Sequence, residues 1–336
     1  MQLQLKNIGM IKEADVAIDG LTVIAGENDT GKSTLSKVLF AFIQTLDTSK
    51  YIEARQKRNY NFGEIFDSYI ENIFENQISK NGYIKIIDIS DDEYHFLLTI
   101  RNDKCLKFSI PELELLEYMN YSISMVESPV VWNFMSIFTQ LPLIENKMNI
   151  NLRYPIIMKD LHFQLSVANR GGKDNIVKNI QSIIGGEFKQ DALGYFFFEK
   201  ENHRIELSNT ATGIKYFGIL QVLSRNNYFT VDDILILDEP EVHLHPKWQL
   251  EMAKVIVELV KNGVKVLVNS HSPYMIEALE RYAEKAEVTA DFYLAENGFI
   301  DKIEDNNSKT LAKIFNKLSA PYETFNHLDS EILKGG

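Results

Sequence analysis

The stretch Gly26-Glu27-Asn28-Asp29-Thr30-Gly31-Lys32-Ser33 decides the fold, and it directly follows the apolar run Leu21 to Ala25. It has the order glycine, four residues, glycine, lysine and hydroxyl residue, which is typical of a phosphate-binding loop between a strand and a helix. Apolar residues then recur at helical spacing and predict a helix from Lys32 to about Thr45, with one face formed by Leu35, Val38, Leu39 and Phe42.

This loop predicts a nucleotide site for ATP with Mg²⁺. Backbone N–H groups of the loop and the positive end of the following helix bind phosphate oxygens. We expect Lys32 to reach the β and γ phosphates, Ser33 to ligate the metal and Thr34 to contact the α phosphate. A carboxylate near phosphates repels them, so Asp29 is expected to point outward. The expected nucleotide-binding residues are Asn28, Asp29, Thr30, Gly31, Lys32, Ser33 and Thr34.

Two further apolar runs end in residues that suit phosphate chemistry. Ile234 to Leu237 is followed by Asp238 and Glu239, and neighbouring residues of a strand face opposite ways. We expect Asp238 to hold the metal through water and Glu239 to orient and deprotonate the attacking water. The run Val264 to Asn269 leads to His271 at an edge where open α/β sheets bind ligands. His271 is expected to donate a hydrogen bond to the γ phosphate.

Composition limits the classes of protein to which the chain can belong. It has 336 residues, 45% of them hydrophobic, which is typical of a globular protein. It contains no apolar stretch of about 18 residues, so we expect no membrane span. The single cysteine, Cys105, fits a cytoplasmic location. A net charge of -12 disfavours unspecific DNA binding. The stretch that comes nearest to a basic cluster contains Lys50, Arg55, Lys57 and Arg58, and we interpret it as a solvated helix face.

The pattern of apolar residues divides the chain into a split core, an insertion and a tail. The core is expected over 1–47 and 190–305, where strand, helix and strand at 234–269 imply parallel pairing. Residues 48–189 mix helical and strand patterns and are interpreted as a compact insertion. No heptad repeat is sustained there over three or four heptads. Residues 306–336 are expected to form a short C-terminal tail.

Three stretches together carry a family resemblance: GENDTGKST, ILILDEPEVHLHP and LVNSHSPYMIEAL. They resemble the ABC-type ATPase heads of the SMC, RecF and OLD (overcoming lysogenization defect) group, and most closely the OLD-like ATPases. The resemblance implies an α/β P-loop NTPase fold with a mainly parallel central sheet, an N-terminal antiparallel β lobe and a mixed α/β insertion. It also implies a homodimer or higher homo-oligomer.

The same resemblance assigns a signature segment to the stretch 208–215, SNTATGIK. In this family the segment contacts the γ phosphate bound by the opposite subunit, which implies a role in trans for Thr210, Ala211, Thr212, Gly213 and Lys215. Ala211 occupies the usual serine position, two residues before Gly213. Either Thr210 or Thr212 supplies the hydroxyl, or the trans contact is weakened.

His243 and His245 have a spacing that also occurs in metal sites, but no further ligands lie nearby in the sequence. The resemblance places both histidines in the segment that faces the other subunit.

OLD proteins carry a nuclease domain after the ATPase head, and only about thirty residues follow Ile303 here, so that nuclease is expected to be absent. The resemblance implies a switch that controls a separately encoded effector, a nuclease or toxin, in prokaryotic anti-phage defence. One alternative function is a RecF-like DNA-repair ATPase that binds DNA directly, and the sequence does not decide whether the chain binds nucleic acid. A second alternative is a nucleotide-gated scaffold with little turnover. A transporter motor is disfavoured, because it would have a serine signature and little insertion.

Overall fold

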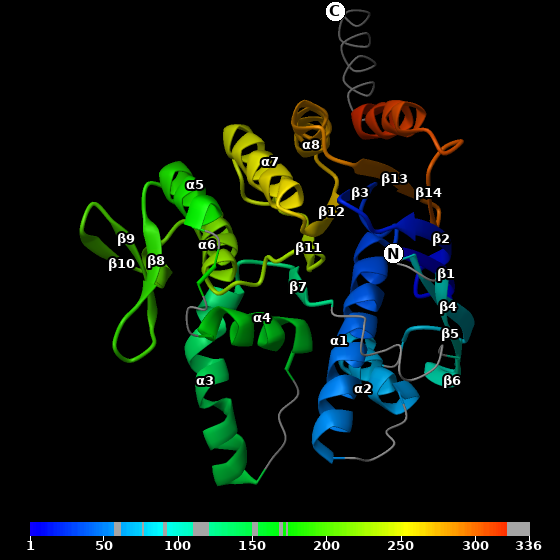
Figure 1. Ribbon diagram of the computed structural model, residues 1–336, viewed down its shortest axis with the longest axis horizontal. Helices are drawn as coiled ribbons and strands as arrows, with labels where there is room; N and C mark the ends of the chain where they lie inside the picture. Colours follow the sequence, from blue (N-terminus) through cyan, green and yellow to red (C-terminus); the bar gives the residue numbers. More distant parts are fainter. Residues whose placement is uncertain are drawn as a thin grey trace, which may run out of the picture.

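The computed structural model describes residues 1–56, 62–75, 77–89, 93–109, 121–149, 154–167, 171–172 and 174–320. An eleven-stranded sheet runs through it in the order β6-β5-β4-β1-β2-β14-β13-β3-β12-β11-β7 (Figure 1). Its strands are β1 (Gln2–Ile8), β2 (Ile11–Ala17), β3 (Leu21–Ala25), β4 (Asn81–Ile89), β5 (Glu93–Arg101), β6 (Lys104–Ser109), β7 (Ile123–Val126), β11 (Ile234–Asp238), β12 (Lys265–Ser270), β13 (Ala290–Glu296) and β14 (Phe299–Asp301).

One half of this sheet is parallel, and it brings three strand ends to one edge. β3 pairs in parallel with β12 and β13, and β11 pairs in parallel with β12 and β7. Asp238 is opposite Asn269, and Asn269 is opposite Ile24, so β11, β12 and β3 end side by side. The other half is antiparallel from β2 through β1, β4 and β5 to β6. These pairings confirm the expected fold class.

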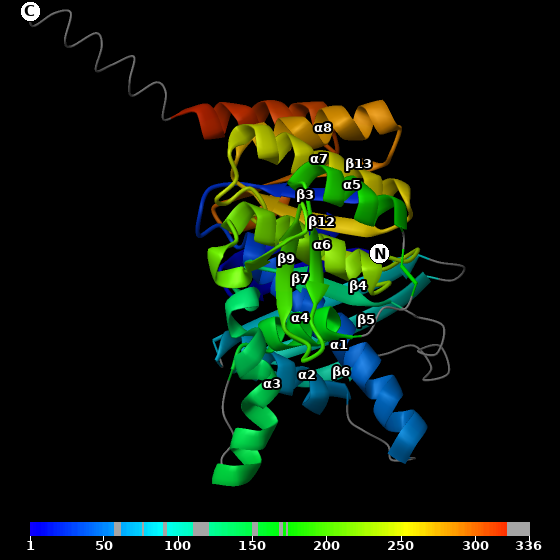
Figure 2. The same cartoon turned by 90° about the vertical axis from the view of Figure 1, so that its left-hand side faces the viewer.

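Alternating side chains bury both faces of the sheet. Val23 and Leu235 belong to one apolar core with residues of α6, α7 and α8, whereas Ile24 and Ile236 belong to a second core with α1 and α2. Figure 2 shows α7 and α8 above the sheet, and the lower ends of α1 and α3 projecting below it. The helices are α1 (Lys32–Gln56), α2 (Phe62–Phe74), α3 (Val131–Met148), α4 (Ile156–Ser166), α5 (Asp174–Ile184), α6 (Thr212–Arg225), α7 (Pro246–Lys261) and α8 (Pro273–Ala286).

The segment 48–189, which the sequence pattern indicates as a compact insertion, contributes strands to the main sheet. Its strands β4, β5 and β6 form one end of the main sheet, and β7 forms the other. β7 was not expected, because all four of its residues are buried and it has no alternation of polar and apolar residues. α4 was not expected either. The exact domain boundaries stay a prediction.

The first helix is longer than its predicted range. α1 runs to Gln56, beyond the expected end at about Thr45. A second sheet of three strands lies apart from the main one and is formed by β8 (Glu187–Gln190), β9 (Phe196–Lys200) and β10 (His203–Glu206).

The C-terminal part of the described chain is a helix over 307–320. The rest of the predicted tail, 321–336, and two members of the basic cluster, Lys57 and Arg58, lie outside the described residues. Within the residues described, no helix combines the length and the apolar character needed to cross a membrane.

Candidate functional site

The glycine-rich loop joins β3 to α1, and two of its glycines are required by their surroundings. A Cβ atom on Gly26 would lie 2.4 Å from the carbonyl oxygen of Ala295 in β13. Gly31 has φ +96°, a conformation that side chains disfavour, and a Cβ there would lie 2.7 Å from Cγ1 of Ile11. Both positions let the loop backbone pass close to neighbouring strands.

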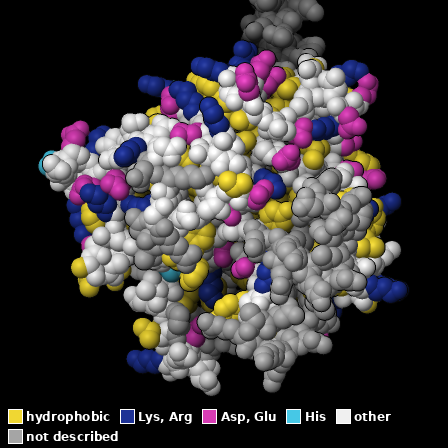
Figure 3. Space-filling model, in the orientation of Figure 1, with side chains coloured by type: hydrophobic (Ala, Val, Ile, Leu, Met, Phe, Trp, Pro, Cys, Tyr) yellow, Lys and Arg dark blue, Asp and Glu magenta, His cyan; other side chains and the backbone are white. Residues whose placement is uncertain are grey.

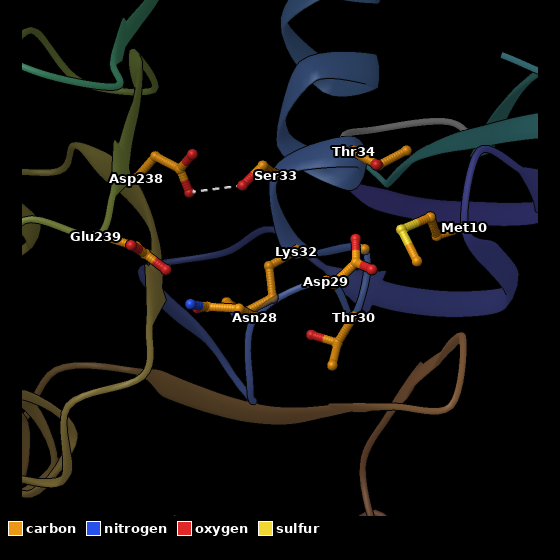
Figure 4. A pocket seen from close by; sticks show the side chains of 10 residues that line it. Met10, Asn28, Asp29, Thr30, Lys32, Ser33, Thr34, Asp238 and Glu239 are labelled. Carbon is orange, nitrogen blue, oxygen red and sulfur yellow. Dashed lines mark hydrogen bonds between the residues drawn. The ribbon is translucent and has the colours of Figure 1, made fainter. Parts of the chain in front are cut away.

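This loop forms one wall of a pocket of about 320 Å³, and the end of β11 forms another (Figure 4). Asp238 and Glu239 lie on the β11 side, opposite the loop and the first turn of α1. All seven expected nucleotide-binding residues line the pocket, together with Met10. The full lining is Met10, Asn28, Asp29, Thr30, Gly31, Lys32, Ser33, Thr34, Asp238 and Glu239.

Lys32 places a cation at this pocket. Its Nζ donates hydrogen bonds to the carbonyl oxygens of Gly26 at 2.9 Å and Glu27 at 2.7 Å, and the residue is only 4% exposed. Burial lowers the pKa of Lys32, and the negative charges of Glu239 and Asp238 oppose this effect. A bound phosphate would add further negative charge beside this ammonium group.

Ser33 and Asp238 meet across the pocket. The Ser33 hydroxyl donates to Oδ1 of Asp238 at 3.2 Å, although the two residues are 205 positions apart. Nδ2 of Asn269 donates to the same carboxylate oxygen at 2.8 Å and so fixes its orientation. A hydroxyl and a carboxylate oxygen are the hard oxygen ligands that Mg²⁺ prefers, so these two residues fit the expected ion.

Glu239 and His271 form a pair beside the pocket. Nδ1 of His271 lies 3.1 Å from Oε1 of Glu239, within hydrogen-bonding distance. Glu239 has φ +49°, and its backbone N–H donates to the carbonyl of Asn269, which fixes the chain just after β11. His271 itself is absent from the pocket lining. Its ring therefore lies close to Glu239, the expected base, and its contact with the γ phosphate stays a prediction.

Asp29 and Thr34 lie on the far side of the pocket from the acids. Figure 4 shows both near Met10, with the carboxylate of Asp29 directed away from Glu239 and Asp238. Asp29 is exposed and has φ +65°. Its side chain nevertheless lines the pocket.

The signature residues surround the start of α6, and none of them lines the loop pocket. The Thr210 hydroxyl donates to the carbonyl of Glu206 at 3.0 Å, whereas Thr212 is exposed as the first residue of the helix. The structure therefore favours Thr212 as the residue with an accessible hydroxyl. Ala211 is the N-cap and makes no side-chain capping bond.

The side chain of Lys215 is buried against α3. Lys215 is 8% exposed, and its Nζ donates to Oδ1 of Asn133 in α3 at 3.2 Å. Burial lowers the pKa of this ammonium group. Of the signature residues, Lys215 is thus engaged within its own subunit.

Two residues at the site were missed by sequence reasoning. Asn269 is fully buried and joins Asp238 to the Ser36 hydroxyl on α1. Glu241 is buried below His271. The sequence contains one signal that could have indicated Asn269. It is a polar residue that directly follows the apolar run Val266 to Val268, at the end of a strand. Among the described residues, no group of three or more His, Cys, Asp and Glu is arranged to hold a metal.

Comparison with known proteins bears on the activity. A family model described as "AAA ATPase domain" matches residues 139–276, a span that includes the signature segment, Glu239 and His271 but not the glycine-rich loop. No curated protein matches the sequence.

Solved structures with a similar fold include the head of an SMC protein bound to the C-winged helix domain of ScpA. It is 15% identical with a TM-score of 0.50, covering 90% of this chain and 96% of that one. The SMC head domain from Thermotoga maritima is 14% identical with a TM-score of 0.45, covering 90% and 98%. The ADP conformation of an ATP-binding cassette of an ABC transporter is 13% identical with a TM-score of 0.39, covering 98% and 99%.

Proposed function

Because this chain is an ATPase with a P-loop and an α/β fold like that of SMC heads, we propose that it is a molecular switch that dimerises around ATP and controls a separate effector. One observation carries the proposal: a hydroxyl, two carboxylates and a buried ammonium group from distant parts of the chain share one pocket, as Ser33, Asp238, Glu239 and Lys32. This is the set of groups that phosphoryl transfer to water requires.

In the proposed reaction, the loop N–H groups and Lys32 bind the β and γ phosphates. Ser33 and Asp238 would hold Mg²⁺, which offsets phosphate charge when bound. Glu239 takes a proton from a water molecule as the water oxygen bonds to the γ phosphorus. The bond from that phosphorus to the bridging oxygen breaks, so ADP and inorganic phosphate are formed. Before this step, when ATP binds, His271 has to leave Glu239 and turn toward the γ phosphate to act as its hydrogen-bond donor.

The second half of each site comes from a partner subunit in this proposal. The exposed start of α6 at Thr212 and Gly213 offers a helix N-terminus to the γ phosphate held by the other subunit. Leu244 packs against Gly213, since a Cβ on this glycine would lie 2.8 Å from its Cδ2 atom. The adjacent His243 is exposed and has φ +65°. ATP thereby becomes part of the interface, and hydrolysis weakens it.

The dimer can be tested directly. Glu239→Gln keeps the shape of the side chain but removes the base, so the variant is expected to retain ATP and run at twice the monomer mass in light scattering after gel filtration. With ADP it is expected to run as a monomer. The double variant Glu239→Gln with Lys32→Ala is the control and should stay monomeric with ATP. A single variant that remains monomeric at saturating ATP contradicts ATP-dependent dimerisation.

Control of a separate effector is the second part of the proposal. It rests on the resemblance of Asp238-Glu239-Pro240-Glu241 and the following HLHP to OLD-like ATPases, and on exposed apolar side chains of α3. Ile137, Leu143 and Met148 are 47%, 72% and 62% exposed on this projecting helix. A surface of this kind suits a protein partner. Figure 3 shows Lys and Arg interspersed with Asp and Glu on the visible face.

Copurification from native cells tests the effector. Tagged Glu239→Gln protein with ATP is expected to retain a separately encoded nuclease or toxin that wild-type protein with ADP releases, or the reverse. A phage-challenge assay with and without the gene then tests the defence role. If DNA is the only molecule recovered, and its recovery falls as the salt concentration is raised, effector control is disproved and the RecF-like alternative is favoured.

A further inference from the structure

Glu241 is a buried carboxylate that touches neither the loop pocket nor solvent. Its side chain is 3% exposed, and it is not among the residues that line the pocket. Oε1 accepts three hydrogen bonds, from the Ser270 hydroxyl at 2.6 Å and from the backbone N–H groups of His271 at 3.0 Å and Ser272 at 3.2 Å. One carboxylate oxygen thus holds the whole turn that carries His271.

This turn is also joined to Glu241 by a second route. The Ser272 hydroxyl donates to Oε1 of Gln249 at 2.8 Å, and Nε2 of Gln249 donates to the carbonyl of Leu244 at 3.1 Å. The backbone N–H of Leu244 in turn donates to the carbonyl of Glu241 at 2.9 Å. The hydrogen bonds therefore close a ring between the loop 239–245 and the turn 270–272.

The two ends of this ring contact different parts of the site. At one end, the His271 ring lies beside Glu239. At the other end, Leu244 packs against Gly213 at the start of α6, and the neighbouring Val242 and His243 are exposed. A shift of the exposed loop cannot occur without moving the His271 backbone, unless the ring opens.

We propose that Glu241 is a positioning residue that couples the loop 239–245 to His271, so that contact with a second subunit at this loop sets where the histidine ring lies. The inference rests on the proposed function and deepens it. Glu241 does not line the loop pocket and acts through His271, because its Oε1 accepts from the backbone N–H at 3.0 Å and lies 3.7 Å from Nδ1 of the ring. Its removal leaves three buried donors without their acceptor, which releases the turn.

The test compares Glu241→Ala with Glu241→Gln. The amide oxygen of glutamine accepts the same three hydrogen bonds, whereas alanine accepts none. We expect Glu241→Ala to lower kcat by about 10- to 100-fold, the order expected for a misplaced catalytic group, with the Kd for ATP within about threefold of wild type. Glu241→Gln is expected to restore most of the lost kcat. Glu251→Ala, a half-buried residue of α7 that pairs with Lys254, is the matched control.

A second readout separates this proposal from the proposed function. The imidazole ¹⁵N signals of His271, identified with His271→Gln, are expected to move further in Glu241→Ala than in Glu241→Gln, both with ADP bound and no turnover, because glutamine keeps the three hydrogen bonds and removes only the charge that lies 3.7 Å from Nδ1. Gln249→Ala opens the ring elsewhere and should shift the same signals if Glu241→Ala does not fold. Unmoved signals with wild-type kcat, or equal losses in the alanine and glutamine variants, would overturn the positioning role. Failure of Glu239→Gln to slow hydrolysis would instead overturn the proposed chemistry.

Discussion

Glu239→Gln is expected to hydrolyse ATP about 10²- to 10⁴-fold more slowly than wild type, the range that a general base contributes. Glutamine retains the side-chain volume beside His271 but cannot accept a proton from water. The Ser33 to Asp238 contact at 3.2 Å is independent of this side chain, so the affinity for ATP should change little. Release of inorganic phosphate gives kcat, and a fluorescent ATP analogue gives Kd.

The control for this variant is Glu251→Gln, which removes a half-buried carboxylate of α7 that pairs with Lys254 and does not line the pocket. It should hydrolyse ATP at the wild-type rate. Hydrolysis at that same rate by Glu239→Gln would contradict the assignment of the base.

Lys32→Ala is expected to have the largest effect on binding. The variant removes the buried ammonium group that lies among Glu239, Asp238 and Glu241. Truncating one partner of a buried charge-assisted contact costs about 2–5 kcal/mol, which corresponds to a rise in the Kd for ATP of roughly 30- to 4,000-fold. Isothermal titration with ATP and Mg²⁺ measures it.

Lys37→Ala is the matched control for Lys32→Ala, because it lies on the same helix and pairs at the surface with Glu127 at 2.9 Å. It should bind ATP like wild type. An unchanged Kd in Lys32→Ala, with a melting temperature equal to that of wild type, would show that the loop does not hold the phosphates.

The nucleotide site could be predicted from the sequence because its chemistry is local to strand ends. The loop Gly26 to Ser33, the pair Asp238 and Glu239, and His271 each follow an apolar run, and parallel strands end at one edge of a sheet. The structure brings the first two sets to one pocket. It pairs the histidine with Glu239, which no sequence pattern indicates.

The middle of the chain was harder to predict, for physical reasons. β7 is buried on both faces between β11 and the neighbouring helices, so its four residues lack alternation. The ammonium group of Lys215 donates to Asn133, which lies 82 positions earlier, and no sequence pattern indicates this contact. The buried role of Glu241 likewise depends on Ser270, His271 and Ser272, which only the fold brings to it.

We propose that three distant stretches of this chain together bind one triphosphate, and a crystal structure of Glu239→Gln with ATP and Mg²⁺ is the decisive test. We expect the β and γ phosphates on the loop beside Lys32, a metal ion on Ser33 near Asp238, and the His271 ring turned from residue 239 toward the γ phosphate. Nucleotide bound elsewhere, or a triphosphate that contacts Lys32 while Asp238 and His271 remain remote from it, would disprove this arrangement.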